Sequence, residues 1–306
     1  MATPSIHTQE SEDVFSLVSP GIALALLFSS TSVMLAQSGT VQVNGVSLPY
    51  EITGQGAPLA LIHGWAVHRG YWDDDVERLG PHYQVIRYDR RGFGEADGKP
   101  DVTADPADLK ALLDHLGVTR AHILGHSQGA GVALTFAVRY PDMVNALVLF
   151  GPAPVLGQDV PASDDFPAFG EWVVLGKTYG VDSLRAAVGR WALERFGGST
   201  DGLADKAQPL MAAYSGADLL DPAPPSNLVQ PAGVGDLAGV AIPTLVIHGD
   251  QEMSFIRAAA DLLAAGIPGA RRVIIPGGGH VVNWQQPDRF AAAVLSFLRD
   301  AEQASR

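Results

Sequence analysis

Gly125-His-Ser-Gln-Gly-Ala-Gly131 follows the short apolar run Ala121–Leu124 and opens an alanine-rich segment, Gln128–Arg139. The run is typical of a buried strand, and the segment is typical of a helix packed closely on a sheet. A glycine-rich turn between them can bind phosphate or hold a strained nucleophile. The phosphate interpretation is weak, because no lysine follows the second glycine and the spacing differs from a dinucleotide fingerprint.

The serine at the centre of this turn fits a nucleophile elbow. Gly125-His-Ser-Gln-Gly129 matches the Gly-x-Ser-x-Gly pattern, in which a sharp turn between a strand and a helix exposes the serine hydroxyl. Such a turn needs small neighbours, and the next helix supplies Gly-Ala-Gly at 129–131. The N-terminus of that helix also favours negative charge beside Ser127. The turn therefore predicts a serine nucleophile.

A serine hydroxyl needs a base to accept its proton, and the base needs an orienting acid. His280 follows three glycines directly after the last predicted strand, at the sheet edge where Ser127 is expected. Asp250 and Glu252 follow the strand before it, so both carboxylates are candidates for the acid. The residues alone leave that choice open.

The rest of the chain alternates between strands and helices, which predicts an α/β fold with a mostly parallel sheet and helices on both faces. The predicted strands are Thr40–Val46, Leu48–Thr53, Pro58–Ile62, Tyr83–Tyr88, Ala121–Leu124, Ala146–Phe150, Thr244–His248 and Arg272–Ile275, and the predicted helices are Tyr71–Leu79, Asp105–Leu116, Gln128–Arg139, Phe255–Ala265 and Pro287 to about Asp300. No buried strand is predicted between Gly151 and about Gly239. We therefore expect a core of residues 37–150 and 240–306, with residues 151–239 forming a helical cap inserted before the acid-bearing strand.

Several motifs together resemble one superfamily. They are His63-Gly-Trp65, Tyr88-Asp-Arg-Arg-Gly-Phe-Gly94, Gly125-His-Ser-Gln-Gly129, Gly249-Asp-Gln-Glu252 and Gly279-His280. In their residues and order, over roughly residues 40–300, they resemble the α/β-hydrolase superfamily, within its capped group of esterases, cofactor-free haloperoxidase-like enzymes and carbon–carbon hydrolases. The motifs are highly specific for the fold and much less specific for the substrate.

The resemblance implies a catalytic triad, with Ser127 as nucleophile and His280 as base. The family's acid lies three residues after the glycine that closes the strand, which here is Glu252. Most members carry Asp at that position, so the longer side chain is a departure from the common form. Asp250 remains the alternative acid.

The resemblance also implies an oxyanion hole formed by the backbone N–H groups of Trp65 and Gln128, because negative charge develops on the substrate oxygen during attack. We expect His63 to shape this loop rather than act as a base. Asp89 is expected to anchor the loop through hydrogen bonds to nearby backbone. Most aromatic residues of the insertion are expected to form the core of the cap, with one or two lining an apolar acyl pocket.

These assignments predict a serine hydrolase that cleaves an ester-like bond through an acyl-enzyme intermediate. The same triad serves lactonases and carbon–carbon bond hydrolases, so both remain alternatives. Serine at the elbow argues against the epoxide hydrolases and haloalkane dehalogenases of the superfamily, which use Asp. A different alternative is a non-catalytic protein that binds a small ligand on the same fold.

Composition narrows the possible partners. The chain has 306 residues and a formal charge of −13, which argues against nucleic-acid binding, and it has no cysteine. His122, His126 and His248 lie near strand ends without the spacing of metal ligands. We expect a small-molecule substrate, no cofactor and no metal; the oligomeric state is not indicated.

The first 36 residues are interpreted as a signal segment or leader. An apolar stretch from Gly21 to Phe28 is followed by small residues that place a cleavage site after Ala36. It is too interrupted by Ser and Thr to predict a stable membrane span. Export is favoured, although no Lys or Arg precedes Arg69; the alternative is a cytoplasmic protein that starts at Met1 or at Met34.

Overall fold

The computed structural model describes residues 1, 36–154, 164–165, 167–221 and 237–304. The chain divides into two units, residues 1–33 and 34–306, and the description below concerns the second. The predicted leader, residues 1–36, lies outside the described residues apart from Met1 and Ala36. Within the described part, no helix is both long and apolar enough to cross a membrane.

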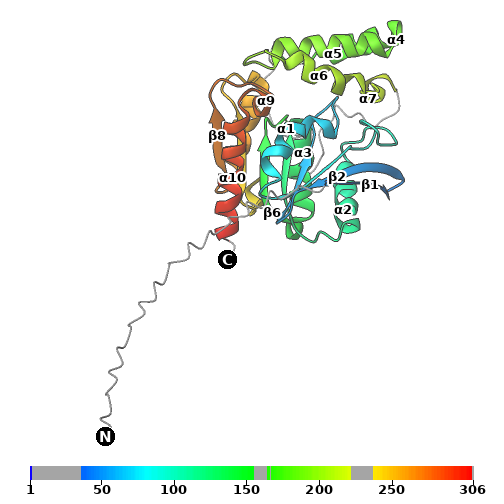
Figure 1. Cartoon of the computed structure of the whole chain (residues 1–306). Helices are drawn as coiled ribbons and strands as arrows, with labels where there is room; N and C mark the ends of the chain where they lie inside the picture. The colour runs from blue at the N-terminus through cyan, green and yellow to red at the C-terminus, as the bar shows by residue number, and fades with distance from the viewer. Residues whose placement is uncertain (2–35, 155–163, 166, 222–236, 305–306) are drawn as a thin grey trace. The chain divides into compact units, whose positions relative to one another are not determined.

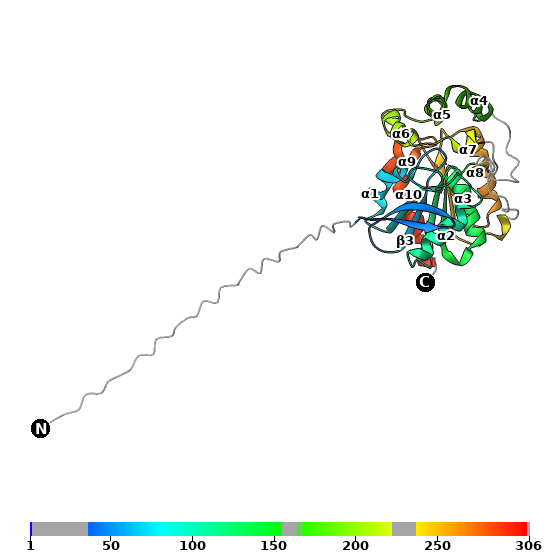
Figure 2. The ribbon, with the colours of Figure 1, turned by 90° about the vertical axis from the view of Figure 1, so that its right-hand side faces the viewer.

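The described residues form one sheet of eight strands, in the order β1-β2-β4-β3-β5-β6-β7-β8. The sheet lies between the helices in the ribbon (Figures 1 and 2). The strands are β1 (Ala36–Val43), β2 (Val46–Thr53), β3 (Pro58–Ile62), β4 (Gln84–Tyr88), β5 (Ala121–His126), β6 (Val144–Phe150), β7 (Thr244–Gly249) and β8 (Arg271–Ile275). In this order, the neighbouring strands from β4 to β8 are parallel. The pairs β1–β2 and β2–β4 are antiparallel. The predicted mostly parallel sheet is confirmed.

Two residues with positive φ explain the antiparallel start. Asn44 (φ 47°) and Gly45 (φ 78°) form the tight turn between β1 and β2. Asn and Gly tolerate this left-handed conformation, and a turn of that hand matches the twist of paired strands. The hairpin pairs Val43 with Val46 and extends back to Ala36 opposite Thr53.

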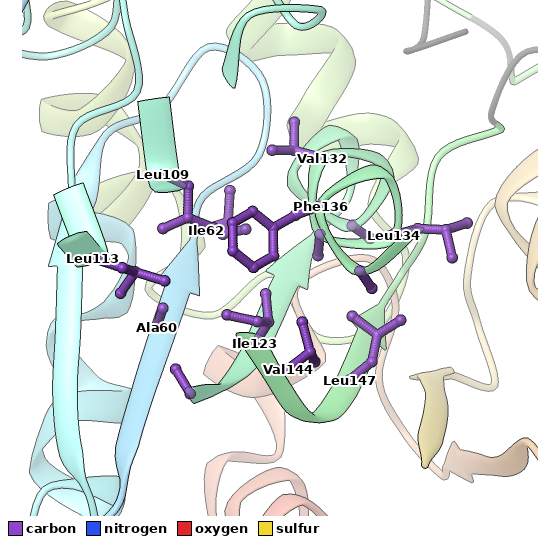
Figure 3. Packing of buried hydrophobic residues seen from close by; sticks show 14 of the residues in the cluster. Ala60, Ile62, Leu109, Leu113, Ile123, Val132, Leu134, Phe136, Val144 and Leu147 are labelled. Atoms are coloured by element: carbon purple, nitrogen blue, oxygen red, sulfur yellow. The ribbon is translucent and has the colours of Figure 1, made fainter. Parts of the chain in front are cut away.

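Helices cover both faces of the sheet. They are α1 (Asp73–Leu79), α2 (Asp105–His115), α3 (Gln128–Arg139), α8 (Ser254–Gly266), α9 (Val282–Gln285) and α10 (Pro287–Ala304), with 3₁₀ turns at η1 (Arg69–Trp72), η2 (Pro141–Met143) and η3 (Leu237–Gly239). Alternate residues of β3 serve opposite faces, since Ala60 and Ile62 pack with α2 and α3 whereas Leu59 and Leu61 pack with α1 and α10. Figure 3 shows the first of these cores, with Phe136 of α3 among the sheet residues.

Among the described residues between β6 and β7 there are four helices: α4 (Phe169–Tyr179), α5 (Val181–Arg195), α6 (Leu203–Ala212) and α7 (Ala217–Leu220). They lie together beyond one end of the sheet in both views of the ribbon (Figures 1 and 2). Their buried side chains pack with Ala66 and Phe93, which follow β3 and β4. We refer to residues 167–221 as the cap; they pack against the loops that follow β3 and β4, and the predicted division into a core and a cap domain stays a prediction.

Candidate active site

Ser127 lies in a strained turn between β5 and α3. Its φ of 55° and ψ of −121° are unusual for a residue with a Cβ. The Ser127 N–H donates to the Phe150 carbonyl at 2.9 Å, which ties the turn to the end of β6. A Cβ at Gly125 would lie 2.2 Å from the Gly129 carbonyl oxygen, so a larger residue at 125 would push the helix away. Strain of this kind is characteristic of functional turns.

His280 and Glu252 form a buried pair at the ends of β8 and β7. The two Glu252 carboxylate oxygens lie 3.0 and 3.1 Å from His280 Nδ1. The Met253 N–H donates to Glu252 Oε1 at 2.9 Å, which fixes the carboxylate from its other side. Gly151, just beyond β6, lies against the pair, and a Cβ there would be 3.2 Å from both His280 Nδ1 and Glu252 Oε2.

Asp250 has a different contact. Its Oδ1 accepts from the Gly277 N–H at 2.9 Å, within the turn after β8. The side chain is exposed, whereas Glu252 and His280 are both about 97% buried, with 3% of each residue accessible. The structure therefore brings Glu252, and not Asp250, against His280.

The backbone of His280 is held on both sides. Its N–H donates to the Phe196 carbonyl of the cap at 2.6 Å. Its carbonyl accepts from Nε2 of His126, 3.0 Å away, so His126 carries its proton on Nε2. The His126 ring stacks on Tyr71 with the ring centroids 4.6 Å apart. Burial lowers the pKa of His126 well below its usual value, which keeps this ring neutral.

Gln285 links the same loop to the cap. Its side-chain Oε1 accepts from the Gly279 N–H at 2.7 Å. Its Nε2 donates to the carbonyls of Gly197 and Ser199, at 2.6 and 3.0 Å. One amide side chain therefore joins the residue before His280 to the cap segment that follows α5. Sequence reasoning identified neither Gln285 nor His126 as a support of the base.

The two residues expected to form the oxyanion hole come from the elbow and from the loop that contacts it. Gln128 is the first residue of α3, and Trp65 lies in the loop after β3. A Cβ at Gly64 would lie 3.2 Å from Ser127 Cβ, so this loop contacts the elbow. The Trp65 indole Nε1 donates to Asp218 Oδ2 of α7 at 2.6 Å, which ties the loop to the cap.

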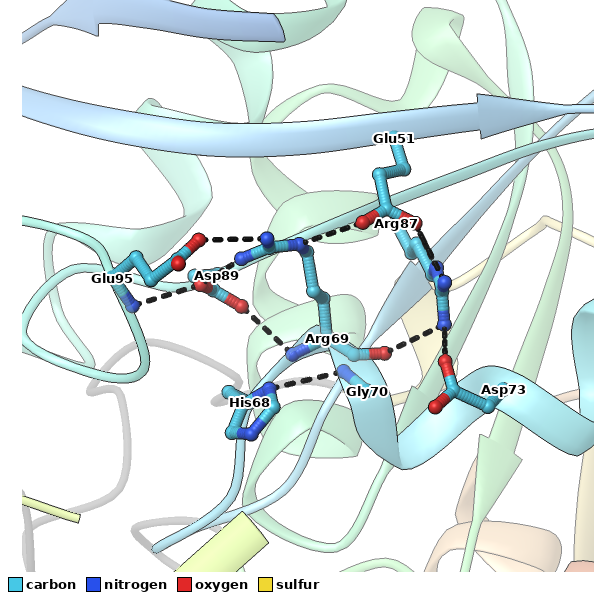
Figure 4. Close-up of polar contacts among 8 residues, drawn as sticks. All are labelled: Glu51, His68, Arg69, Gly70, Asp73, Arg87, Asp89 and Glu95. Atoms are coloured by element: carbon cyan, nitrogen blue, oxygen red, sulfur yellow. Dashed lines mark hydrogen bonds and ion pairs between the residues drawn. The ribbon is translucent and has the colours of Figure 1, made fainter. Parts of the chain in front are cut away.

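Asp89 holds the same loop at its far end (Figure 4). Its two oxygens accept from the backbone N–H groups of Arg69, at 2.8 Å, and Glu95, at 2.9 Å. The Arg69 side chain also pairs with Asp89, Glu51 and Glu95. His63 has its own contacts within the loop, with Nδ1 2.8 Å from the Gly64 carbonyl and Nε2 accepting from the Arg90 N–H at 3.0 Å. Neither side chain contacts Ser127 or His280 among the described interactions.

Some aromatic residues of the insertion pack beside Trp65, and others lie near His280. Trp172 and Tyr214 are buried in the cap beside Trp65, whereas Tyr179 is exposed. Phe196 lies closest to the polar centre, with its ring 5.0 Å from that of His280, and Trp191 packs on Phe196. Within the described residues, no group of His, Cys, Asp or Glu side chains is arranged to hold a metal ion.

Residues 57–287 match the model of the alpha/beta hydrolase fold family. The chain is 28% identical to a pimeloyl-(acyl-carrier protein) methyl ester esterase of Nitrosomonas europaea, over 80% of this chain and 97% of the relative. It is 29% identical to a 2-hydroxymuconate semialdehyde hydrolase of Pseudomonas sp. strain CF600, over 85% and 93%. The enol-lactonase of Burkholderia xenovorans LB400 superposes with a TM-score of 0.72 at 24% identity, covering 85% of this chain and all of that structure.

Proposed function

From the premise that this chain belongs to the α/β-hydrolase family and is a hydrolase, we propose that it cleaves an ester-like bond of a small or medium acyl substrate. Ser127 is the nucleophile, His280 the base and Glu252 the acid of the triad. The observation that carries the proposal is the buried contact of both Glu252 oxygens with His280 Nδ1, at 3.0 and 3.1 Å.

The contact determines which proton His280 carries. A carboxylate only accepts hydrogen bonds, so Nδ1 keeps its hydrogen and Nε2 presents a lone pair. That lone pair takes the proton of Ser127 as its oxygen attacks the substrate carbonyl. The resulting imidazolium is stabilised by Glu252 and returns the proton to the leaving alcohol.

The negative charge formed on the substrate oxygen is stabilised by the backbone N–H groups of Trp65 and Gln128. Water then attacks the acyl-enzyme, with His280 again accepting a proton, and releases the acid.

The acyl part of the substrate is expected to be apolar. The side chains around the proposed centre on the cap side are aromatic, with Phe196 beside His280 and Trp65 packed among Trp172 and Tyr214. Such walls favour apolar groups. Ester hydrolysis in the Nitrosomonas relative is consistent with this substrate class.

Carbon–carbon bond hydrolysis is the second candidate, because a relative of that activity aligns over 85% of this chain and the same triad serves it. The experiment is to assay the purified protein on nitrophenyl esters of increasing acyl length, on lactones and on a vinylogous 1,5-diketone. We expect turnover of the short esters, and loss of that turnover in Ser127→Ala. Binding without turnover of any of these compounds would favour the alternative of a non-catalytic ligand-binding protein.

A further inference from the structure

Arg90 is a fully buried cation that contacts the two segments of the proposed oxyanion hole. Its Nη1 donates to the carbonyl of His63 at 3.2 Å and to that of Gly64 at 3.4 Å. Its Nη2 donates to the side-chain Oε1 of Gln128 at 2.9 Å. The first segment leads to Trp65, and the second begins α3.

The Gly64 contact matters because of peptide geometry. The Gly64 carbonyl and the Trp65 N–H belong to one peptide unit, in which the two groups point in opposite directions. The carbonyl accepts from His63 Nδ1 at 2.8 Å as well as from Arg90. Fixing the oxygen on one side therefore fixes the direction of the Trp65 N–H on the other.

His63 supports this arrangement only in one protonation state. Donation by Nδ1 to the Gly64 carbonyl leaves Nε2 as the acceptor of the Arg90 N–H, at 3.0 Å. Burial, and next the charge of Arg90, lower the pKa of His63 well below its usual value, so the ring stays neutral. The backbone N–H of Arg90 therefore holds the His63 ring, and the Arg90 side chain holds the carbonyls of His63 and Gly64.

The charge of Arg90 is balanced by a buried carboxylate. Its Nε donates to Asp105 Oδ2 of α2 at 2.9 Å, and both side chains are buried. The Phe93 ring lies under the guanidinium, 5.1 Å away. A planar guanidinium can bind Asp105, Gln128 and the loop carbonyls together, whereas a lysine ammonium has three donors at a single point.

We propose that Arg90 is a positioning residue that aligns the Trp65 and Gln128 halves of the oxyanion hole. This inference rests on the proposed serine hydrolase function. It assigns to Arg90 an effect on the transition state, where the substrate oxygen is charged, and little effect on binding of the neutral substrate. A purely structural ion pair with Asp105 would instead affect stability alone.

Arg90→Lys tests the proposal, because it retains the charge opposite Asp105 but loses the planar fork. Arg91→Lys is the matched control: Arg91 is the next residue and binds a buried carboxylate, Asp108, with an Nη2 to Oδ1 distance of 2.8 Å. In the proposal, Arg90→Lys lowers kcat about 10- to 100-fold with KM within about threefold, the cost of misplacing oxyanion donors. Arg91→Lys leaves both constants within about threefold.

A second measurement separates positioning from general damage. An aryl trifluoromethyl ketone forms a hemiketal oxyanion with Ser127, so its affinity should fall in Arg90→Lys in parallel with kcat. The double variant Arg90→Met/Asp105→Asn removes the buried pair without leaving a lone charge and should show the same loss. Denaturation midpoints establish that each variant is folded.

The proposal is overturned if folded Arg90 variants keep wild-type kcat, if only KM rises, or if ketone affinity is unchanged. If neither Arg90 variant folds, Gln128→Met decides, since it removes the Arg90 acceptor and keeps the backbone N–H; kcat equal to wild type would then overturn it. Failure of the underlying function is distinguishable, because wild-type protein would then turn over no ester, or Ser127→Ala would remain active.

Discussion

Glu252→Gln tests the assignment of the acid by a change of one atom. In the structure, Oε1 of Glu252 accepts the Met253 N–H at 2.9 Å, and Oε2 lies 3.0 Å from His280 Nδ1. A glutamine that keeps the first bond directs its NH₂ group at Nδ1, and its Oε1, 3.1 Å from Nδ1 in the wild type, is then shared with the Met253 N–H. An NH₂ group donates, so the variant favours the tautomer in which Nδ1 presents its lone pair and Nε2 carries the hydrogen. His280 in that tautomer cannot accept the proton of Ser127.

The size of the effect follows from the loss of the correct tautomer. Amide substitution of a triad acid lowers kcat by about 10⁴, which corresponds to about 5 kcal/mol in the activation barrier. Side-chain volume is unchanged, so we expect little change in KM. The assay is the rate of release of nitrophenol from a short-chain ester, with circular dichroism to establish folding.

Asp250→Asn is the matched control for this experiment. Asparagine retains the oxygen that accepts the Gly277 N–H, at 2.9 Å in the wild type, so activity should stay within about threefold of wild type. The reasoning is refuted if folded Glu252→Gln keeps near-normal kcat, and the assignment is reversed if Asp250→Asn is the inactive variant.

Two further variants test a support of the base and a buried carboxyl group. Gln285→Leu removes the link between Gly279 and the cap. We expect kcat to fall about tenfold, because a reacting group is then misplaced. A folded variant with wild-type kcat would contradict a role of Gln285 in positioning His280. Asp75 is buried against Asn283, and burial raises its pKa from 3.8 to about 7. The folded protein therefore binds a proton that the unfolded chain has lost, so the contribution of this carboxyl to stability falls between about pH 4 and 7 and is constant above. The free energy of unfolding, measured by urea titration, should therefore rise in Asp75→Asn relative to wild type as the pH increases from about 4 to 7. If the two proteins show the same dependence of this free energy on pH, the reasoning is contradicted.

Much of the fold could be predicted because its signals are local. The observed first and last residues of β3 and of α3 agree with the sequence prediction. A short apolar run and a Gly-Ala-Gly helix start fit few other local structures. The helix predicted over Tyr71–Leu79 differs, because its first residues form the 3₁₀ turn η1, in which His68 Nδ1 accepts the Gly70 N–H. The extension of β1 back to Ala36 depends on pairing with Thr53 of β2. The residue pattern of one strand does not show how far its partner extends.

The positions of the candidate residues were predictable where a side chain follows a strand end, as Ser127, His280 and the two candidate acids do. The choice between the acids depended on where the loop after β7 turns, and only the fold brings Glu252 to Nδ1. His126 and Gln285 were missed as supports, because their partners are 154 and 88 residues away and no local pattern marks such contacts. Arg90 lies within one of the motifs, but its side chain donates to carbonyls of another loop, which the motif does not indicate.

Identification of the residue modified by a fluorophosphonate tests the central claim most directly. Such a probe is attacked by an activated serine and leaves a stable adduct on its oxygen. We predict that intact mass measurement finds a single adduct on the wild-type protein, that peptide fragmentation places it on Ser127, and that ester turnover falls in step with labelling. Folded Ser127→Ala should show neither adduct nor turnover. Labelling of another residue, or full turnover in a protein unmodified at Ser127, would contradict the serine mechanism.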